Sequence, residues 1–248
     1  MFLDYLRRLL FGTLSALSAD RGVFVRIAWR WYAIWGLVLL AISPVPGAGP
    51  RNLVHLAMAA LVGMAVAVPW HRHLLLREGV PPFRPPFERR HLRYGLRYVL
   101  IAVATVIALF TAVYVSNRFV ATRAGGLGVF AVLTIFLILP ALNRVLLILP
   151  AAALDETLAP GEAFVAGSGL GLPMTLVWLC FALVLGCAMF LALLVVAILS
   201  DRDGLSTLAP YLLPPVWHAG SVFLNGALIT GGYYIFRERQ TFRKRQNV

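Results

Sequence analysis

The chain has 248 residues, of which 60% are hydrophobic and only 13% are charged, and its formal net charge is +12. A mean hydropathy of +0.84 excludes an ordinary soluble domain. The arginines gather at the ends of apolar runs, where anionic lipid headgroups lie, so we expect no nucleic acid as a partner. The predicted fold class is all-α, a polytopic membrane helix bundle.

Residues 1–22 are predicted to form an amphipathic helix that lies in the headgroup plane. The alternative is a signal peptide with Arg7 and Arg8 as its basic region. The apolar residues expected to share one face of the helix are Leu3, Leu6, Leu10, Leu14 and Leu17.

Residues 23–248 are predicted to form a single transmembrane domain, because six apolar runs are long enough to cross a bilayer. The predicted spans are 23–42, 53–70, 96–115, 127–149, 173–200 and 208–236. We expect Arg26 and Arg30 in the first span to snorkel to the headgroups. Pro140 should kink the fourth span, and Pro214-Pro215 should interrupt the sixth. A short cytoplasmic helix is predicted to begin at Pro160.

The distribution of cations predicts the orientation. Sixteen Lys and Arg residues lie at the predicted inner ends and loops, seven of them between Trp70 and Arg97 in the basic stretch around loop 71–95. The predicted outer loops hold four, namely Arg51, Arg118, Arg123 and Arg202. The positive-inside rule therefore places both termini in the cytoplasm, which requires an even number of spans.

The basic loop is also the predicted binding site for anionic phospholipid. Helix should resume near Glu88, after a polyproline-like spacer over Val80–Phe87, so that three arginines recur one turn apart. Arginines near an anionic surface attract lipid phosphates. The predicted lipid-binding residues are Arg72, Arg77, Arg89, Arg90, Arg93 and Arg97.

Three acids after the fourth span, Asp155, Glu156 and Glu162, should face the same compartment as the basic loop. They are predicted to form an ion-pair clamp with its arginines; a pair of catalytic carboxylates is the alternative, and it would need a cleft.

The histidines and cysteines do not predict a cofactor site. His55 and His218 should lie at similar depths in the membrane, where they could share a metal or a haem, although a hydrogen bond to a neighbouring helix is the default. Cys180 and Cys187 are seven residues apart on one predicted helix, beyond disulfide reach. No cluster has metal-ligand spacing, so we expect no metal and no cofactor.

Two segments resemble a known family. They are Trp70–Glu78 and the run Arg144–Asp155, which Pro160–Phe164 follows. Both are similar to segments of uncharacterised six-span inner-membrane proteins of alphaproteobacteria. Members of that family often have an apolar residue at the position of His73 and a glycine at that of Arg77. The family has no established activity, so the resemblance implies a bacterial inner-membrane topology and no chemistry.

Three function classes follow. The first is a non-enzymatic assembly, scaffold or envelope-adaptor protein, whose partners would be anionic phospholipid and other membrane proteins. It is favoured because no Walker loop, HExxH or GxSxG motif occurs. The second is a small-molecule transporter or channel with broken helices. The third is a lipid-modifying enzyme that would use His71, His73 and His91; no catalytic residue is assigned.

Overall fold

The computed structural model describes residues 1–43, 48–83, 86–119, 123–203 and 205–246, with side chains described except at 48, 50, 119, 123, 196–203, 205–212 and 243–246. Within these ranges every regular element is a helix, which confirms the all-α prediction. The elements are α1 (Phe2–Ala41), α2 (Ala48–Leu76), α3 (Arg89–Phe119), α4 (Arg123–Leu133), the π-helix η1 (Thr134–Ile138), α5 (Leu139–Val145), α6 (Ile148–Ala153), α7 (Pro160–Ala166), α8 (Gly171–Asp203) and α9 (Leu205–Gln246).

Five segments are long and apolar enough to cross a membrane, as expected for a multi-pass membrane protein. They are Phe2–Ala41, Arg51–Leu76, Arg89–Arg118, Ala124–Ala153 and Gly171–Val195. The sixth predicted span, 208–236, falls in α9, and its first side chains lie outside the described residues. The count of six spans therefore stays a prediction.

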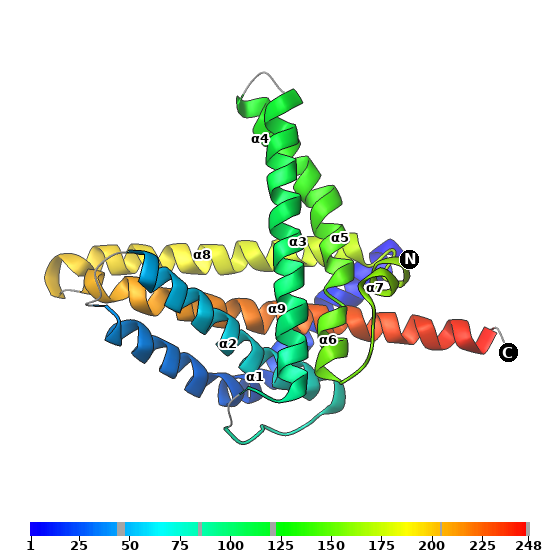
Figure 1. The fold of residues 1–248 in the computed structure, drawn as a ribbon, viewed down its shortest axis with the longest axis horizontal. Helices are drawn as coiled ribbons and strands as arrows, with labels where there is room; N and C mark the ends of the chain where they lie inside the picture. Colours follow the sequence, from blue (N-terminus) through cyan, green and yellow to red (C-terminus); the bar gives the residue numbers. More distant parts are fainter. Residues whose placement is uncertain (44–47, 84–85, 120–122, 204, 247–248) are drawn as a thin grey trace.

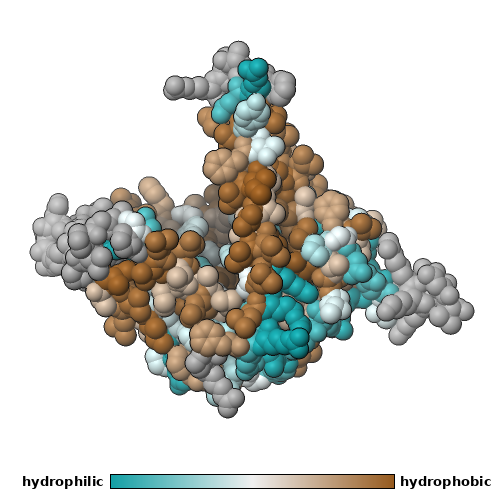
Figure 2. Space-filling model, in the orientation of Figure 1, coloured by the Kyte–Doolittle hydropathy of each residue, from teal (hydrophilic) through white to brown (hydrophobic). Residues whose placement is uncertain are grey.

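The helices form two groups (Figure 1). Helices α1, α2, α8 and α9 pack along one another, and α3 pairs with α4 and η1 in a hairpin that stands across this bundle. The hairpin is attached at its base, where α5 packs on α8 and α3 packs on α2 and α6. Figure 2 shows hydrophobic side chains over most of the hairpin and hydrophilic ones at its tip and base.

Two glycines let the hairpin approach the bundle. A Cβ on Gly95 of α3 would overlap the thioether of Met64 on α2. A Cβ on Gly171, at the start of α8, would overlap the carbonyl oxygen of Pro140 on α5. The contact at Gly95 is with a side chain, whereas at Gly171 a backbone carbonyl approaches so closely that only a residue without a side chain fits.

The structure corrects the prediction of a separate N-terminal helix. Residues 2–41 form one continuous helix, with no break between the predicted interfacial helix and the first span. Helix α9 covers part of α1, where Gly231 lies against Leu9 and Thr13, while Leu3 and Leu14 of the predicted apolar stripe are exposed. The buried residues of this half of α1 are Tyr5, Leu9, Thr13 and Leu17.

Prolines behave in two ways. Residues Thr134–Ile138 form a π-helix directly before Pro140, which confirms the predicted distortion, since proline cannot donate a hydrogen bond to the carbonyl four residues earlier. Pro214-Pro215, in contrast, does not interrupt α9, and that prediction is wrong. Membrane helices tolerate proline where neighbouring groups satisfy the freed carbonyls.

The basic loop is shorter than predicted. Helix α2 continues to Leu76 and α3 begins at Arg89, so the connection is 77–88 rather than 71–95. The predictions of helix resuming near Glu88 and of a short helix beginning at Pro160 are both confirmed. The Ala159 N–H donates to the Glu162 carboxylate at 3.2 Å, which satisfies one free N–H at the start of α7.

Candidate functional site

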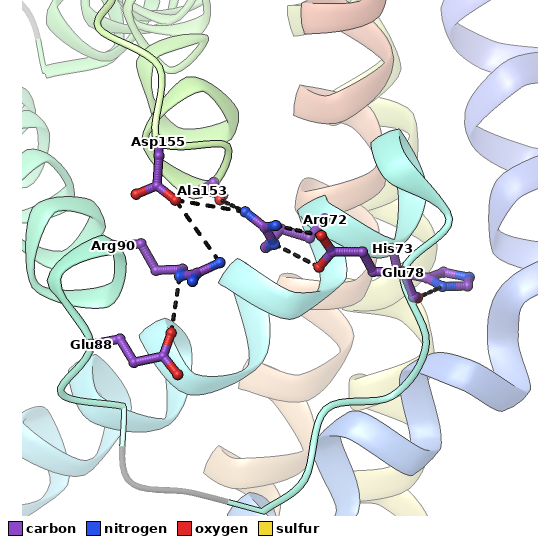
Figure 3. A network of polar contacts seen from close by, with 7 residues as sticks. All are labelled: Arg72, His73, Glu78, Glu88, Arg90, Ala153 and Asp155. Atoms are coloured by element: carbon purple, nitrogen blue, oxygen red, sulfur yellow. Dashed lines mark hydrogen bonds and ion pairs between the residues drawn. The ribbon is translucent and has the colours of Figure 1, made fainter.

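Asp155 is the centre of a charged cluster at the base of the hairpin (Figure 3). It follows α6 in a left-handed conformation (φ 61°), which aspartate tolerates better than most residues. Its carboxylate lies 3.8 Å from Arg72, 3.9 Å from Arg90 and 3.7 Å from Arg93. One acid thus connects α6 to the end of α2 and the start of α3.

Arg72 makes the most contacts in this cluster. It donates to both carboxylate oxygens of Glu78, with Nε at 2.7 Å from Oε2, and to the backbone oxygen of Ala153 at 2.9 Å. The bonded guanidinium lowers the pKa of Glu78 from its usual value because it stabilises the charged carboxylate. Arg72 therefore fastens the connecting segment 77–88 and the end of α6 to α2.

A second cluster ties α1 to the end of α2. Arg77, also in a left-handed conformation (φ 56°), pairs with Asp20 of α1 at 2.8 Å. Asp20 also lies 3.2 Å from His73 Nε2, and His73 Nδ1 lies 2.7 Å from the backbone oxygen of Glu78. Both ring nitrogens of His73 thus face oxygen acceptors.

Most of the predicted lipid-binding arginines contact oxygens of the chain itself, and their binding of lipid stays a prediction. The chain's own oxygens engage Arg72, Arg77, Arg90 and Arg93 as described above, and Arg97 donates to the Ile148 carbonyl at 2.9 Å. Arg89 is exposed. A local pattern of cations shows where a basic surface lies, but it cannot show which acids and carbonyls from distant segments pack against it.

The three acids of the predicted ion-pair clamp have different partners. Asp155 meets the arginines of the basic stretch, but Glu156 accepts a hydrogen bond from Tyr233 and lies 3.3 Å from Arg237, both on α9. Glu162 caps α7 instead. Neighbouring acids thus contact different helices, since Asp155 lies near arginines of α2 and α3 and Glu156 near Tyr233 and Arg237 of α9.

His71 is fully buried and belongs to a hydrogen-bonded chain that the sequence analysis missed. The Thr230 hydroxyl donates to the Gly226 carbonyl at 2.6 Å, so it accepts from His71 Nδ1 at 2.7 Å. The Tyr94 hydroxyl then donates to His71 Nε2 at 3.3 Å. This pattern assigns the neutral tautomer with the proton on Nδ1 and links α2, α3 and α9. The available signal was weak, a single hydroxyl within an apolar run.

The predicted pair of membrane histidines surrounds Trp35. The ring centroids of His55 and His218 each lie 5.1 Å from that of Trp35, and His218 Nδ1 lies 2.8 Å from the Tyr32 hydroxyl. Within the described ranges, no group of three or more His, Cys, Asp and Glu residues could hold a metal ion. Asn143 of α5 donates to the Thr175 hydroxyl of α8 at 2.9 Å and so links these two helices.

A pocket of about 410 Å³ lies between α1, α2, the segment 78–86, of which residues 78–83 and Pro86 form the described lining, and the start of α3. Its charged lining combines the Arg72–Glu78 and Arg90–Glu88 pairs with Arg26 and Arg30 of α1. Its apolar lining includes Trp29, Trp31 and Phe83. Arg26 and Arg30 can be recognised in the sequence as two arginines in the first predicted span, but the sequence predicts only that their side chains extend to the headgroups.

The arrangement as a whole suits anion binding rather than acid–base chemistry. Of the three interface histidines, His91 lines the pocket, whereas His71 and His73 are buried with partners. Arginine retains its charge at any physiological pH and binds phosphate or carboxylate in a fork geometry. No protein-family model, curated protein or solved structure matches this chain.

Proposed function

We propose that this chain is a non-enzymatic integral protein of a bacterial inner membrane, with both termini in the cytoplasm, which serves as an assembly, scaffold or envelope-adaptor module. We further propose that its arginine-rich end contacts anionic phospholipid, and that it belongs with the six-span alphaproteobacterial proteins that its motifs resemble.

The observation that carries this proposal is that several charged groups join helices and loops, while two arginines line a pocket. Asp155, Arg72 and Asp20 join helices and loops to one another, which is the work of structural ion pairs. Arg26 and Arg30 face a pocket beside aromatic residues of the kind that line the membrane interface. Fixed cations at this level favour anionic headgroups.

The two ends of the chain support a common compartment for the termini. Arg8 near the start of α1 forms an ion pair with Glu238 near the end of α9, and Arg239 lies 5.6 Å from the ring of Tyr5. Figure 1 shows both chain ends at the same end of the molecule. Such an arrangement requires an even number of crossings, and the excess of cations at this end favours the cytoplasm.

A second candidate, a small-molecule transporter, is favoured by the interrupted fourth apolar segment. That segment changes from α-helix to π-helix at Thr134 and breaks again between Val145 and Ile148. Broken membrane helices form the substrate sites of many transporters.

Lipid retention tests the proposal. The full chain is extracted from its native membrane, and bound lipids are identified by native mass spectrometry. We expect phosphatidylglycerol or cardiolipin to be enriched over phosphatidylethanolamine relative to the membrane. Retained lipid that matches the bulk membrane, together with tight DNA binding, would contradict the proposal. Accumulation of one lipid intermediate in cells that lack the protein would favour an enzyme instead.

A further inference from the structure

We propose that the pocket between α1, α2 and segment 78–86 binds one phosphate group, and that Arg26 and Arg30 are its ligands. The inference rests on the proposed function and makes it specific, since it replaces a general basic surface by one site of defined chemistry.

The distribution of charge in the pocket supports an anionic ligand. Its two acids are already neutralised: Glu78 is held by Arg72 through two hydrogen bonds, and Glu88 lies 2.9 Å from Arg90. In the part of the chain that the structure describes, no carboxylate lies within 4.0 Å of Arg26 or Arg30. Two guanidinium groups are thus left uncompensated, which matches a ligand with one or two negative charges.

The geometry of these two arginines suits a phosphate oxygen cluster. They lie four residues apart on α1, so both project from the same face, separated by about 6 Å along the axis. The guanidinium carbon of Arg30 lies 5.4 Å from the ring centroid of Trp29 and 5.9 Å from that of Phe83. Stacking occupies the faces of the guanidinium and leaves its N–H groups free at the edge.

Part of the remaining lining cannot donate hydrogen bonds to an anion. Pro81, Pro82 and Pro86 on the connecting segment have no N–H to donate. His91 also lines the pocket, and its Nδ1 is buried with no hydrogen-bond partner among the described residues. The volume of about 410 Å³ falls in the usual range for small-ligand sites and accommodates a phosphate with an attached small alcohol.

The same chemistry has two sources, the headgroup of an anionic phospholipid or a soluble phosphate ester. The aromatic residues Trp29 and Trp31 place the pocket at the level expected for headgroups, which favours the lipid. Titration with lipid and competition by a soluble phosphate ester distinguish the two sources.

Native mass spectrometry of the full chain, titrated with dioleoyl phosphatidylglycerol or phosphatidylethanolamine, tests the site. The pocket variant is Arg26→Gln with Arg30→Gln. The control is Arg21→Gln with Arg118→Gln, which removes the same charge at exposed positions that neither line the pocket nor belong to the predicted lipid-binding set. We expect phosphatidylglycerol binding to weaken about 25-fold in the pocket variant, or about fivefold for each arginine, and to change less than about twofold in the control.

Glycerol phosphate added as competitor distinguishes the two sources. Displacement of the lipid shows that the site recognises the phosphate ester alone, and no displacement shows that it needs the acyl chains. Unchanged phosphatidylglycerol binding in a folded pocket variant would overturn the site but leave the proposed function standing. Equal binding of both lipids by the wild type would instead overturn the proposed function.

A variant that fails to fold does not prevent the test. Arg30 packs on two rings, so its replacement can loosen segment 78–86. Arg26→Gln alone removes one ligand without disturbing that stack, and it should still weaken binding about fivefold. Wild-type binding by this variant would count against the site.

Discussion

At the scale of single residues, several buried polar side chains of this chain are hydrogen-bonded across helices. Buried His71 is the clearest case, because both of its ring nitrogens have partners, on α9 and on α3. A buried donor that loses its partner costs about 1–3 kcal/mol, whereas the bond itself contributes less. Such residues therefore stabilise the packing of particular helices against one another.

Thr230→Val tests this network. The substitution keeps the shape but leaves the N–H of His71 Nδ1 without an acceptor, and we expect a loss of about 1–3 kcal/mol in stability. Thr241→Val is the matched control, because that hydroxyl makes a similar bond to the Arg237 carbonyl but is exposed, and it should change stability by less than about 0.5 kcal/mol. Thermal unfolding in detergent measures both. Equal midpoints for the two variants would contradict the network.

The pH dependence of stability follows from Glu78. Its folded pKa is lowered by the bonded Arg72, so its contribution is present above its ordinary pKa of 4.5 and is lost as the pH falls through the folded value. The side chain is 44% exposed, so we expect only about 0.2–1 kcal/mol. Glu78→Gln should narrow the gap between the unfolding midpoints at pH 7 and pH 4. An unchanged gap would show that the pair contributes no stability.

At the scale of elements, the sequence predicts helices well and their ends less well. Apolar length identified α2, α3 and α8, and Pro160 marked the start of α7. The break expected after residue 22 does not exist, since nothing in a periodic pattern shows that α9 will cover the face that carries Leu9 and Thr13. The predicted interruption at prolines 214 and 215 is wrong, because the effect of a proline on a membrane helix depends on whether neighbouring groups satisfy the freed carbonyls.

The candidate site could also be predicted only in part from the sequence. The basic character of the 70–97 stretch was readable, and so was Asp155 as a partner for its arginines. The pocket was not predicted, because it depends on residues 78–83 lying against α1, with Phe83 next to Arg30. Contacts between residues fifty positions apart leave no local pattern.

Gly171→Ala tests the attachment of the hairpin to the bundle. The added methyl group would overlap the Pro140 carbonyl, and relieving that overlap should cost about 1–3 kcal/mol. Gly186→Ala on the same helix is the control, because a Cβ there has nothing within 4 Å. We expect a lowered unfolding midpoint for the first variant and an unchanged or raised one for the second. Equal effects would mean that α5 and α8 are not in close contact.

At the scale of the whole molecule, hydrophobic side chains cover most of the hairpin, and hydrophilic ones gather at its tip and base (Figure 2). The hairpin exposes large side chains along its length, such as Ile107 and Phe110, of which 61% and 72% is accessible. A surface of this kind requires lipid or another membrane protein to cover it. The charged cluster at the base is then placed at the membrane interface.

A spin label at Ile107→Cys tests whether lipid covers the hairpin. The native thiols Cys180 and Cys187 are exposed and are first replaced by alanine. In lipid nanodiscs we expect the label to be more accessible to dissolved oxygen than to a water-soluble nickel chelate. Arg118→Cys at the tip should give the reverse result. Preferential access of the nickel chelate at 107 would contradict a lipid-covered hairpin.

We propose that the arginine-rich end faces the cytoplasm. The most direct test of this proposal is labelling of single cysteines by a membrane-impermeant maleimide, in the same cysteine-free background. Phe87→Cys reports on the connecting segment, and Arg118→Cys reports on the opposite end of α3. We expect that in spheroplasts Arg118→Cys is labelled and that Phe87→Cys is labelled only after lysis. Labelling of Phe87→Cys in intact spheroplasts would contradict it.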